Sequence, residues 1–433
     1  MRVLVISRSP WRNDNSFGNT YNNIFGKMKD VMIANIYLAD GIPDTNNPNV
    51  VSYYQISEKQ IIHTILNRTT HAVGSVIDVH MVDNTIIEGQ GTYDKAITRM
   101  KKKRWSGFFL ARELVWRIGK IDFDGLLSFS RAFNPDIIFL PFYYAVYVDR
   151  VALFVQQKLN IPMVLEASID IYSLKQLSFD PVFWINRFII RRYVRKTVAA
   201  SEKLFVISDE MKRDYERYLK IKCGVLYKFP VRERKLSDYV PKKDKIEFLF
   251  TGNIGSGRWK TLSYLGDTLS EAKIGELIIY TPTPLSRRMK RRLKSCVVKP
   301  PVPAGEVIEL QNNADILVHT ESFDLKDKLE VRYSISTKVM DYISTERCIL
   351  AIGPEDIASI SFLKSHDLAI VATSEELIKT TVNEIKMNPQ MICRYVKNTN
   401  TYMNNLTVDV PQQDELRADL ERIIDSFRRK NHD

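Results

Sequence analysis

The sequence predicts an α/β protein made of two doubly wound domains that face each other across a cleft. Three observations lead to this prediction. The chain has 433 residues, the length of about two or three domains. Its C-terminal half alternates short apolar runs with amphipathic segments, and the N-terminal half repeats this rhythm less regularly. A stretch rich in proline and charge, residues 229–245, predicts a linker between the halves.

Six apolar runs in the C-terminal half predict parallel strands, because strands covered on both faces are apolar nearly throughout. The predicted strands are Ile246–Thr251, Glu276–Thr281, Cys296–Lys299, Asp315–His319, Cys348–Ile352 and Leu368–Ala372. The predicted helices between them are residues 261–273, 284–294, 304–313, 336–345 and 355–365. This alternation indicates a doubly wound sheet, in which ligands bind at the carboxyl ends of the strands.

The N-terminal half predicts five strands and a largely helical segment. The strands are Arg2–Ser7, Val31–Leu38, Asp136–Leu140, Pro162–Ala167 and Lys203–Ser208. Residues 57–125 are expected to be mostly helical and to carry an insertion rich in Lys and aromatic residues, and helical spacing predicts a last helix over residues 411–430. The predicted domains are therefore residues 1–235, residues 236–410, and a final helix in residues 411–433 that crosses back to the N-terminal domain.

Composition narrows the class of protein. The content is 45% hydrophobic and 10% aromatic, which can fill sizeable cores and excludes a wholly disordered chain. The four cysteines are far apart and form no CxxC pair, which favours a reducing compartment over a disulfide scaffold or a zinc site. No apolar run is long enough to span a bilayer, and the start of the chain lacks the pattern of a signal peptide. We therefore expect a cytoplasmic protein.

A glycine-rich loop after the first strand of the C-terminal half predicts a phosphate site. In FTGNIGSGRWK, the residues Gly252, Gly255 and Gly257 let the backbone approach a ligand. Arg258 and Lys260 add positive charge at the start of the next helix, whose free N–H groups favour an anion. The spacing is GxxGxG, so the loop is neither the usual dinucleotide fingerprint nor a Walker A loop. An ordinary glycine-rich turn with solvated basic residues is the alternative.

A second candidate lies around the fourth strand of the same half. Glu321 follows this strand, and a helix is predicted to begin near Ser336. Ser336 and Thr337 at the helix N-terminus, with Lys338, would then hold a diphosphate. Asp341 would accept hydrogen bonds from two sugar hydroxyls. The alternative is a solvated ion pair between Lys338 and Asp341, which would contribute only about 0.2–0.5 kcal/mol.

The order of these segments resembles a known family. FLFTGNIGSGRW, ELIIYTPTP, ADILVHTESF and SISTKVMDYISTERCILAIGP are similar to the donor domain of GT-B glycosyltransferases, especially family 4, of the capsular, exopolysaccharide or O-antigen type. SEKLFVISDEMKRDYERYLKIKCGVLYKFPV resembles the end of their acceptor domain, and the match covers roughly residues 195–375. The resemblance implies two Rossmann-like domains, of which the C-terminal one binds a nucleotide-diphosphate sugar (a UDP- or GDP-sugar) as donor and the N-terminal one binds a glycan acceptor.

The resemblance also suggests roles for individual residues. Family members commonly place a basic pair on the diphosphate, to which Arg258 and Lys260 correspond. A carboxylate usually holds the nucleotide ribose, and Asp341 stands at that place. The sequence departs from the family's Glu-x7-Glu pattern, because Tyr333 stands eight residues before Asp341. Glu321 is our candidate for the missing catalytic glutamate.

The N-terminal half offers fewer candidates. After the strand at residues 162–167 the family often carries a His-Asp pair, which is absent here. Asp170 is our catalytic candidate in this region, and Glu166 is either a second polar group of the site or a buried, paired core carboxylate. The loop after the first strand contains Gly18, which would let the loop approach the donor phosphate or the acceptor. Helix capping by neighbours such as Asn15 is the alternative.

Positive charge is concentrated in three windows. The formal net charge is +12, and the excess of Lys and Arg lies in residues 97–120, 184–203 and 287–299. The first two windows also contain aromatic and aliphatic residues, as interfacial anchors do, so we expect peripheral contact with the inner membrane surface. A plainly solvated basic face is the alternative there and is the expectation for residues 287–294. Nucleic acid is disfavoured, because no groove-reading or stacking module is visible.

Together these features predict a glycosyltransferase that moves a sugar to a hydroxyl of a lipid-linked bacterial glycan. Charge on the leaving nucleotide diphosphate would be stabilised by Arg258, Lys260 and Lys338, without a metal. Retention of the anomeric configuration is implied by the resemblance alone. Two alternatives stay open: a nucleotide-sugar 2-epimerase with the same fold, and a basic nucleic-acid-binding protein without enzymatic activity.

Overall fold

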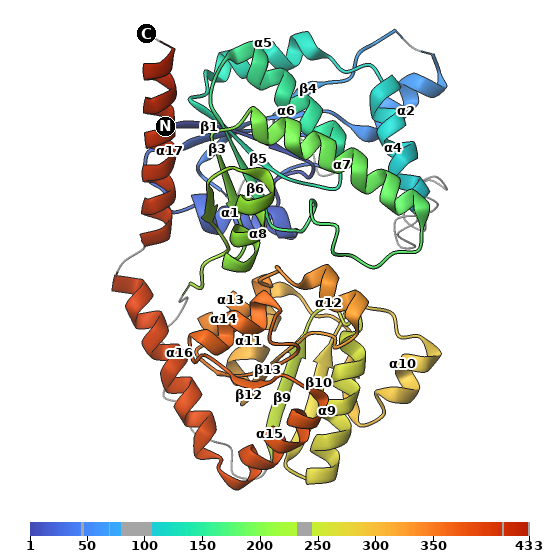
Figure 1. Cartoon of the computed structure of the whole chain (residues 1–433), viewed down its shortest axis with the longest axis vertical. Coiled ribbons are helices and arrows are strands. Elements are labelled where there is room, and N and C mark those ends of the chain that lie inside the picture. Colours follow the sequence, from blue (N-terminus) through green and yellow to red (C-terminus); the bar gives the residue numbers. More distant parts are fainter. Residues whose placement is uncertain (45–46, 69, 79–105, 232–244, 409–410, 432–433) are drawn as a thin grey trace. The chain divides into compact units, whose positions relative to one another are not determined.

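The chain forms two compact units, Met1–Tyr227 with Gln412–Asp433, and Lys228–Pro411 (Figure 1). The computed structural model describes residues 1–44, 47–68, 70–78, 106–231, 245–408 and 411–431. Part of the predicted basic insertion, residues 79–105, and most of the predicted linker, residues 232–244, lie outside the described residues.

The first unit is built on an eight-stranded sheet of order β4-β3-β2-β1-β5-β6-β7-β8. Its strands are β1 Arg2–Ser7, β2 Met32–Tyr37, β3 Val50–Gln55, β4 Ser75–Ile77, β5 Ile137–Pro141, β6 Met163–Ala167, β7 Lys203–Val206 and β8 Cys223–Val225. Every neighbouring pair is parallel except β3 and β4. The strand order reverses at β1, as in a doubly wound sheet.

Helices of the first unit cover this sheet. They are α1 Ser16–Phe25, α2 Glu58–Leu66, α4 Ser106–Ile118, α5 Phe123–Phe133, α6 Val146–Leu159, α7 Pro181–Ala199, α8 Asp209–Leu219 and α17 Pro411–Lys430. The last helix, α17, packs on this unit, where Asp419 pairs with Lys203 and Arg428 pairs with Asp136.

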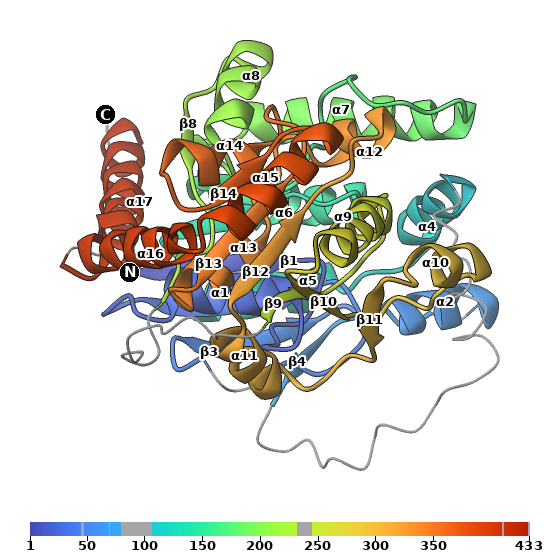
Figure 2. The same ribbon diagram turned by 90° about the horizontal axis from the view of Figure 1, so that it is seen from below.

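The second unit contains a six-stranded sheet of order β11-β10-β9-β12-β13-β14, parallel throughout. Its strands are β9 Ile246–Thr251, β10 Gly275–Tyr280, β11 Cys296–Lys299, β12 Ile316–Thr320, β13 Cys348–Ile352 and β14 Ile370–Ala372. Its helices are α9 Arg258–Ala272, α10 Arg287–Arg292, α11 Ala304–Asn313, α12 Leu325–Val331, α13 Thr337–Ser344, α14 Ala358–Ser365, α15 Glu375–Met387 and α16 Gln390–Val408. The order reverses between β9 and β12. Figure 2 shows α9 and α15 over one face of this sheet and α11 over the other.

Burial on both faces explains why the strands could be found from the sequence. All side chains of β5, β6, β12 and β13 are buried, and burying one large aliphatic side chain contributes about 1.5–3 kcal/mol. The six strands predicted in the C-terminal half are all present, and so is the predicted doubly wound architecture of each unit.

Two expectations for the N-terminal half were wrong in detail. The short strands β3, β4 and β8 were not predicted, and β4 lies in the segment expected to be mostly helical. Two of its three side chains are exposed, because β4 is an edge strand held by backbone hydrogen bonds to β3, so it leaves little apolar pattern in the sequence.

Candidate functional site

The predicted glycine-rich loop joins β9 to α9 in the second unit. Gly252 and Gly257 have φ angles of 125° and 74°, in the region that residues with a Cβ rarely adopt. A Cβ on Gly257 would collide with the side chain of Ser322, so the loop packs directly against the loop that follows β12. The left-handed Gly257 is also the N-cap of α9, which is why this helix begins at Arg258 and not near Thr261 as expected.

An ion pair joins these two loops. The Nε and Nη2 atoms of Arg258 donate to the two carboxylate oxygens of Glu321 at 2.9 and 3.0 Å. The side chains are 19% and 4% exposed, so the pair is bidentate and largely withdrawn from water. Burial raises the pKa of Glu321, and the Arg258 charge opposes part of this rise. Both oxygens of the predicted catalytic Glu321 thus hold Arg258 in place.

Lys338 lies beside the same loop. Its Nζ is 4.3 Å from the centre of the Phe250 ring, and a Cβ on Gly252 would lie only 3.1 Å from it. Burial lowers the pKa of Lys338 to about 8, and the Arg258 charge adds to this effect. The predicted residues Gly252, Arg258 and Lys338 therefore come together at the carboxyl ends of β9 and β12.

The N-terminus of α13 lies at this cluster. Ser336 is the N-cap residue, but its side chain makes no capping hydrogen bond, and Thr337 is the first residue of the helix. The N–H groups of the first turn are thus left without a side-chain cap, as a helix N-terminus that receives an anion requires.

Three other predicted residues have partners of their own. Asp341 accepts a hydrogen bond from Lys228 Nζ at 2.5 Å and is 41% exposed, so the alternative pair with Lys338 is not what the structure contains. Lys260 pairs with Asp324 on the surface, where both side chains are nearly half exposed. Gly255 donates its N–H to the side chain of Asn253 at 2.6 Å and keeps the loop turned.

His319, the residue two before Glu321, was not among the predicted site residues. Its Nε2 is 2.9 Å from Ser359 Oγ, and its buried Nδ1 has no hydrogen-bond partner among the described residues. Burial, with the Lys338 and Arg258 charges, holds the pKa of His319 well below its usual value. A histidine inside an otherwise apolar strand was the signal that could have identified it.

Asp170, the catalytic candidate of the first unit, has a closed hydrogen-bond shell. Its carboxylate is buried and accepts hydrogen bonds from Arg187, from the Tyr215 hydroxyl, from the N–H groups of Tyr172 and Ser173, and from the Ser173 hydroxyl. This arrangement fixes the segment after β6 against α7 and α8. The geometry therefore favours a structural role for Asp170 over the predicted catalytic one.

Glu166 and Gly18 also lie at the carboxyl edge of the first sheet. Glu166 is buried, accepts from Tyr21 and Ser168 at 2.7 and 2.8 Å, and has its pKa raised by burial to about 7. Glu166 therefore has the surroundings of the buried, paired core carboxylate that was one of its two predicted roles. Gly18 donates its N–H to the side chain of Asn15 at 2.8 Å, so the capping alternative is present as well. The described residues contain no group of three or more His, Cys, Asp or Glu placed to hold a metal ion.

No protein-family model and no curated protein matches the chain. Solved structures do match it over nearly its whole length. The α,α-trehalose-phosphate synthase (UDP-forming) from Burkholderia xenovorans, in complex with glucose-6-phosphate, has 9% identity and a TM-score of 0.56, with 97% of this chain and 100% of that chain covered. A trehalose-6-phosphate structure from E. coli, bound with UDP-2-fluoro glucose, has 11% identity and a TM-score of 0.57, with 97% and 99% covered.

A variant of the Thermobaculum terrenum O-GlcNAc transferase is also similar, with 10% identity and a TM-score of 0.56 over 100% of this chain and 69% of that chain. At such identities the likeness concerns the backbone and its topology. The chain therefore has the fold of the GT-B glycosyltransferases, as the sequence motifs implied.

Proposed function

We propose that this chain is a glycosyltransferase that takes a sugar from a nucleotide-diphosphate donor. The observation that carries the proposal is the cluster at the ends of β9 and β12, where Arg258, Lys338 and the uncapped N-terminus of α13 meet. Strand order reverses between β9 and β12, and ligands of doubly wound sheets bind at such a switch point.

The charges of this cluster suit a diphosphate. Arg258 is balanced by Glu321, whereas Lys338 rests on an aromatic ring and has a lowered pKa. Glu321 and Asp341 act on Lys338 only from beyond ion-pair distance, so an arriving phosphate would supply a direct partner for it and would accept hydrogen bonds from Arg258. The same groups would stabilise the charge that develops on the leaving nucleotide diphosphate. Glu321 acts here by holding Arg258 in its position.

The nature of the donor and acceptor extends the proposal. The UDP-forming synthase and the structure bound with UDP-2-fluoro glucose favour a UDP-sugar over a GDP-sugar as donor. The order of the sequence motifs supports family 4, and with it a retaining reaction, Asp341 on the nucleotide ribose and an acceptor hydroxyl on a bacterial glycan bound by the first unit. A lipid-linked glycan at the cytoplasmic face of the membrane fits the basic and apolar helices of that unit.

A panel of UDP- and GDP-sugars tests the proposal by thermal shift and product analysis. Binding raises the free energy of unfolding by mass action, by about 2.7 kcal/mol at a hundredfold excess over Kd. We expect a shift with one donor class that is lost in Arg258→Ala and kept in Lys290→Ala, a variant of the exposed basic helix α10. The absence of a shift with every sugar nucleotide would overturn the proposal, and a free epimer of the donor would assign a 2-epimerase instead.

A further inference from the structure

Helix α4 buries Arg112 and exposes two aliphatic side chains, Leu114 and Ile118. Leu114 and Ile118 are 56% and 59% exposed. Arg112 turns inward, and its Nε donates to the buried carboxylate of Glu58 at 2.6 Å. A helix on the surface of a soluble domain normally shows the opposite arrangement. Because taking an ion pair out of water has a desolvation cost, this inversion suggests that the outer face of α4 serves a contact of its own.

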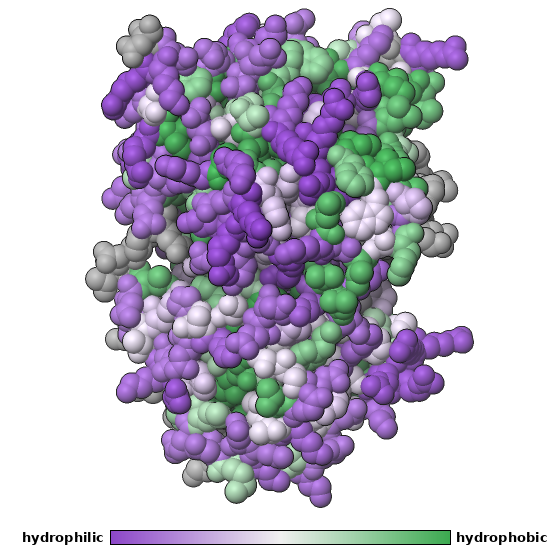
Figure 3. Space-filling view, in the orientation of Figure 1, coloured by the Kyte–Doolittle hydropathy of each residue, from purple (hydrophilic) through white to green (hydrophobic). Residues whose placement is uncertain are grey.

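Helix α7, which packs against α4, repeats the inversion in its first half. Ile185 and Phe188 are 52% and 57% exposed, while the intervening Arg187 is buried against Asp170. We call the exposed aliphatic and aromatic side chains of α4, α7 and the loop before α7 the apolar face. Its members are Leu114, Ile118, Leu174, Leu177, Phe179, Ile185, Phe188 and Ile189. Figure 3 shows hydrophobic surface over α2 and α4, next to this loop.

The outer surface of α7 changes from apolar to basic along the helix. Arg192 and Lys196 continue the helical spacing of Ile185 and Phe188, and both are exposed. In the part of the chain that the structure describes, no carboxylate lies within ion-pair distance of Arg192 or Lys196. The apolar face is therefore bordered by positive charge that no carboxylate among the described residues pairs with.

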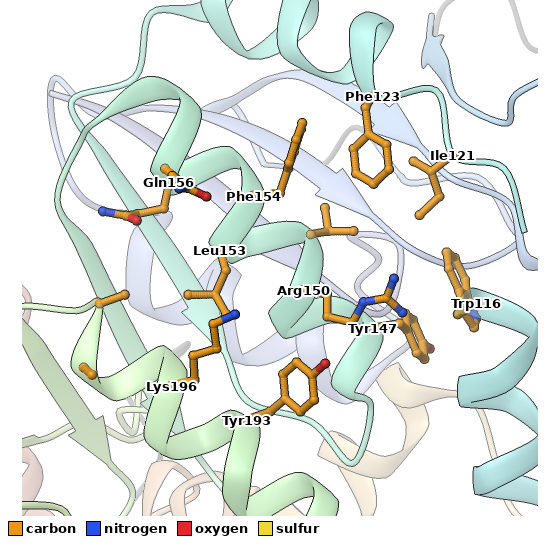
Figure 4. A pocket seen from close by; sticks show the side chains of 14 residues that line it. Trp116, Ile121, Phe123, Tyr147, Arg150, Leu153, Phe154, Gln156, Tyr193 and Lys196 are labelled. Atoms are coloured by element: carbon orange, nitrogen blue, oxygen red, sulfur yellow. The ribbon is translucent and has the colours of Figure 1, made fainter. Parts of the chain in front are cut away.

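A hollow of about 640 Å³ opens between α4, α5, α6 and α7, next to this border (Figure 4). Two aromatic pairs form part of its wall: Trp116 stacks on Tyr147 with ring centres 4.3 Å apart, and Phe123 lies 4.4 Å from Phe154. Its polar groups are Arg150, Gln156, Gln157, Tyr193 and Lys196.

The two cations of the hollow, Arg150 and Lys196, form no ion pair with the described residues. Figure 4 shows Arg150 projecting from α6, and Tyr193 and Lys196 from α7, around the same space. Among the described residues no carboxylate forms an ion pair with Arg150. The Arg150 charge acts on the carboxylate of Glu113 from beyond ion-pair distance, and this carboxylate accepts a hydrogen bond from the N–H of Val146 at 2.6 Å. Two cations and a phenol hydroxyl that line the hollow can therefore contact an anionic ligand.

We propose that this hollow binds the phosphate headgroup of an anionic phospholipid, with Arg150 and Lys196 as its counter-charges, while the apolar face enters the bilayer interface. The apolar side chains match the acyl chains of an anionic bilayer, and the unpaired cations match its negative headgroups. A soluble phosphorylated glycan would use the cations and the aromatic wall but would gain nothing from an exposed Phe179 or Phe188. The inference names the partner for the membrane contact proposed above and does not require sugar transfer.

Co-sedimentation of the full chain with vesicles tests this inference. We expect binding to phosphatidylcholine vesicles that contain phosphatidylglycerol, and little binding to phosphatidylcholine alone. The double variant Arg150→Gln/Lys196→Gln should bind the anionic vesicles about thirtyfold more weakly. The matched control Lys290→Gln/Arg291→Gln removes the same charge from α10 and should stay within about twofold of the wild type, since these cations lie in the second unit.

The apolar face is tested separately by Ile185→Ser/Phe188→Ser, which should weaken binding by at least about tenfold, because two exposed side chains lose their burial in lipid. Equal losses in the Arg150/Lys196 variant and its control would overturn the inference in favour of nonspecific attraction. A wild-type protein that does not bind anionic vesicles would also overturn the inference. So would release from the vesicles by inorganic phosphate at constant ionic strength, which would assign the hollow to free phosphate.

The result is separable from the proposed enzymatic function. Arg150→Gln/Lys196→Gln should keep the thermal shift with the donor nucleotide sugar, because both residues lie in the first unit and the donor cluster lies in the second. Loss of vesicle binding with an unchanged donor shift supports the inference, and vesicle binding that is unchanged in this variant contradicts it.

Discussion

Each unit contains a buried pair of an arginine and a carboxylate near the carboxyl edge of its sheet, and the two pairs differ in what surrounds them. Around Arg187 and Asp170, backbone N–H groups, hydroxyls and carbonyls complete the hydrogen-bonding capacity of both partners. Around Arg258 and Glu321, Lys338 rests on a ring and His319 Nδ1 has no partner among the described residues. The Arg187–Asp170 pair is also the more deeply buried, with side chains 1% and 2% exposed against 19% and 4% for Arg258 and Glu321.

This difference separates a structural ion pair from a binding site. A buried charge in a completed shell gains nothing from a ligand, whereas a buried cation with an incomplete shell gains a counter-charge. The second pair also lies where strand order reverses and where glycines bring the backbone close. The contrast predicts opposite consequences for mutations: loss of stability at the first pair, and loss of donor binding at the second.

Asp170→Ala should have the largest effect, on stability. It leaves Arg187 charged and buried without its carboxylate, and breaking such a pair costs about 3–5 kcal/mol. Urea unfolding of the first unit measures this loss. The control Asp14→Ala removes an exposed carboxylate paired with Arg12 and should change stability by less than about 1 kcal/mol. A stable Asp170→Ala protein that has lost transfer would restore the catalytic role predicted from the sequence.

Arg258→Ala should have the next largest effect, on catalysis. Removing one donor that stabilises developing negative charge lowers turnover by about 10²–10³-fold. Because this variant also leaves Glu321 buried without a partner, the double variant Arg258→Ala/Glu321→Gln serves as its companion. We expect the double variant to recover thermal stability but not transfer. Recovery of transfer would show that Arg258 balances Glu321 without contacting the diphosphate.

The sequence indicated where the strands end, but not which side chains at those ends form pairs. FTGNIGSGRW and HTES were found because glycines and polar residues interrupt apolar runs. Arg258 contacts Glu321 because β9 lies beside β12 in the sheet. The periodicity of the sequence does not reveal this strand order. Arg112 is similar: its partner Glu58 comes from α2, 54 residues earlier in the sequence, and no local pattern pairs the two.

Lys338→Met should stabilise the protein while it removes donor binding. The lowered pKa of about 8, against 10.5 for an exposed lysine, means that the folded protein disfavours the charged form. Wild-type stability should therefore rise as pH increases from about 8 to 10.5, because the unfolded chain binds the extra proton in that range. The variant should lack this rise and gain about 1–3 kcal/mol at pH 7. Donor binding equal to that of the wild type would exclude Lys338 from the site.

Lys260→Ala should have the smallest effect on stability and donor binding. It allows Lys260 to be compared with Arg258 within the second unit. Lys260 and Arg258 share the first turn of α9, but Lys260 pairs with Asp324 at the surface, where water screens both charges. Such a pair contributes about 0–1 kcal/mol to stability, and its flexible ammonium would contribute less to donor binding than a guanidinium already fixed by Glu321. Donor titrations should show a loss of affinity below about tenfold. A loss as large as that of Arg258→Ala would mean that exposure, and not the fixed geometry of Arg258, governs diphosphate binding.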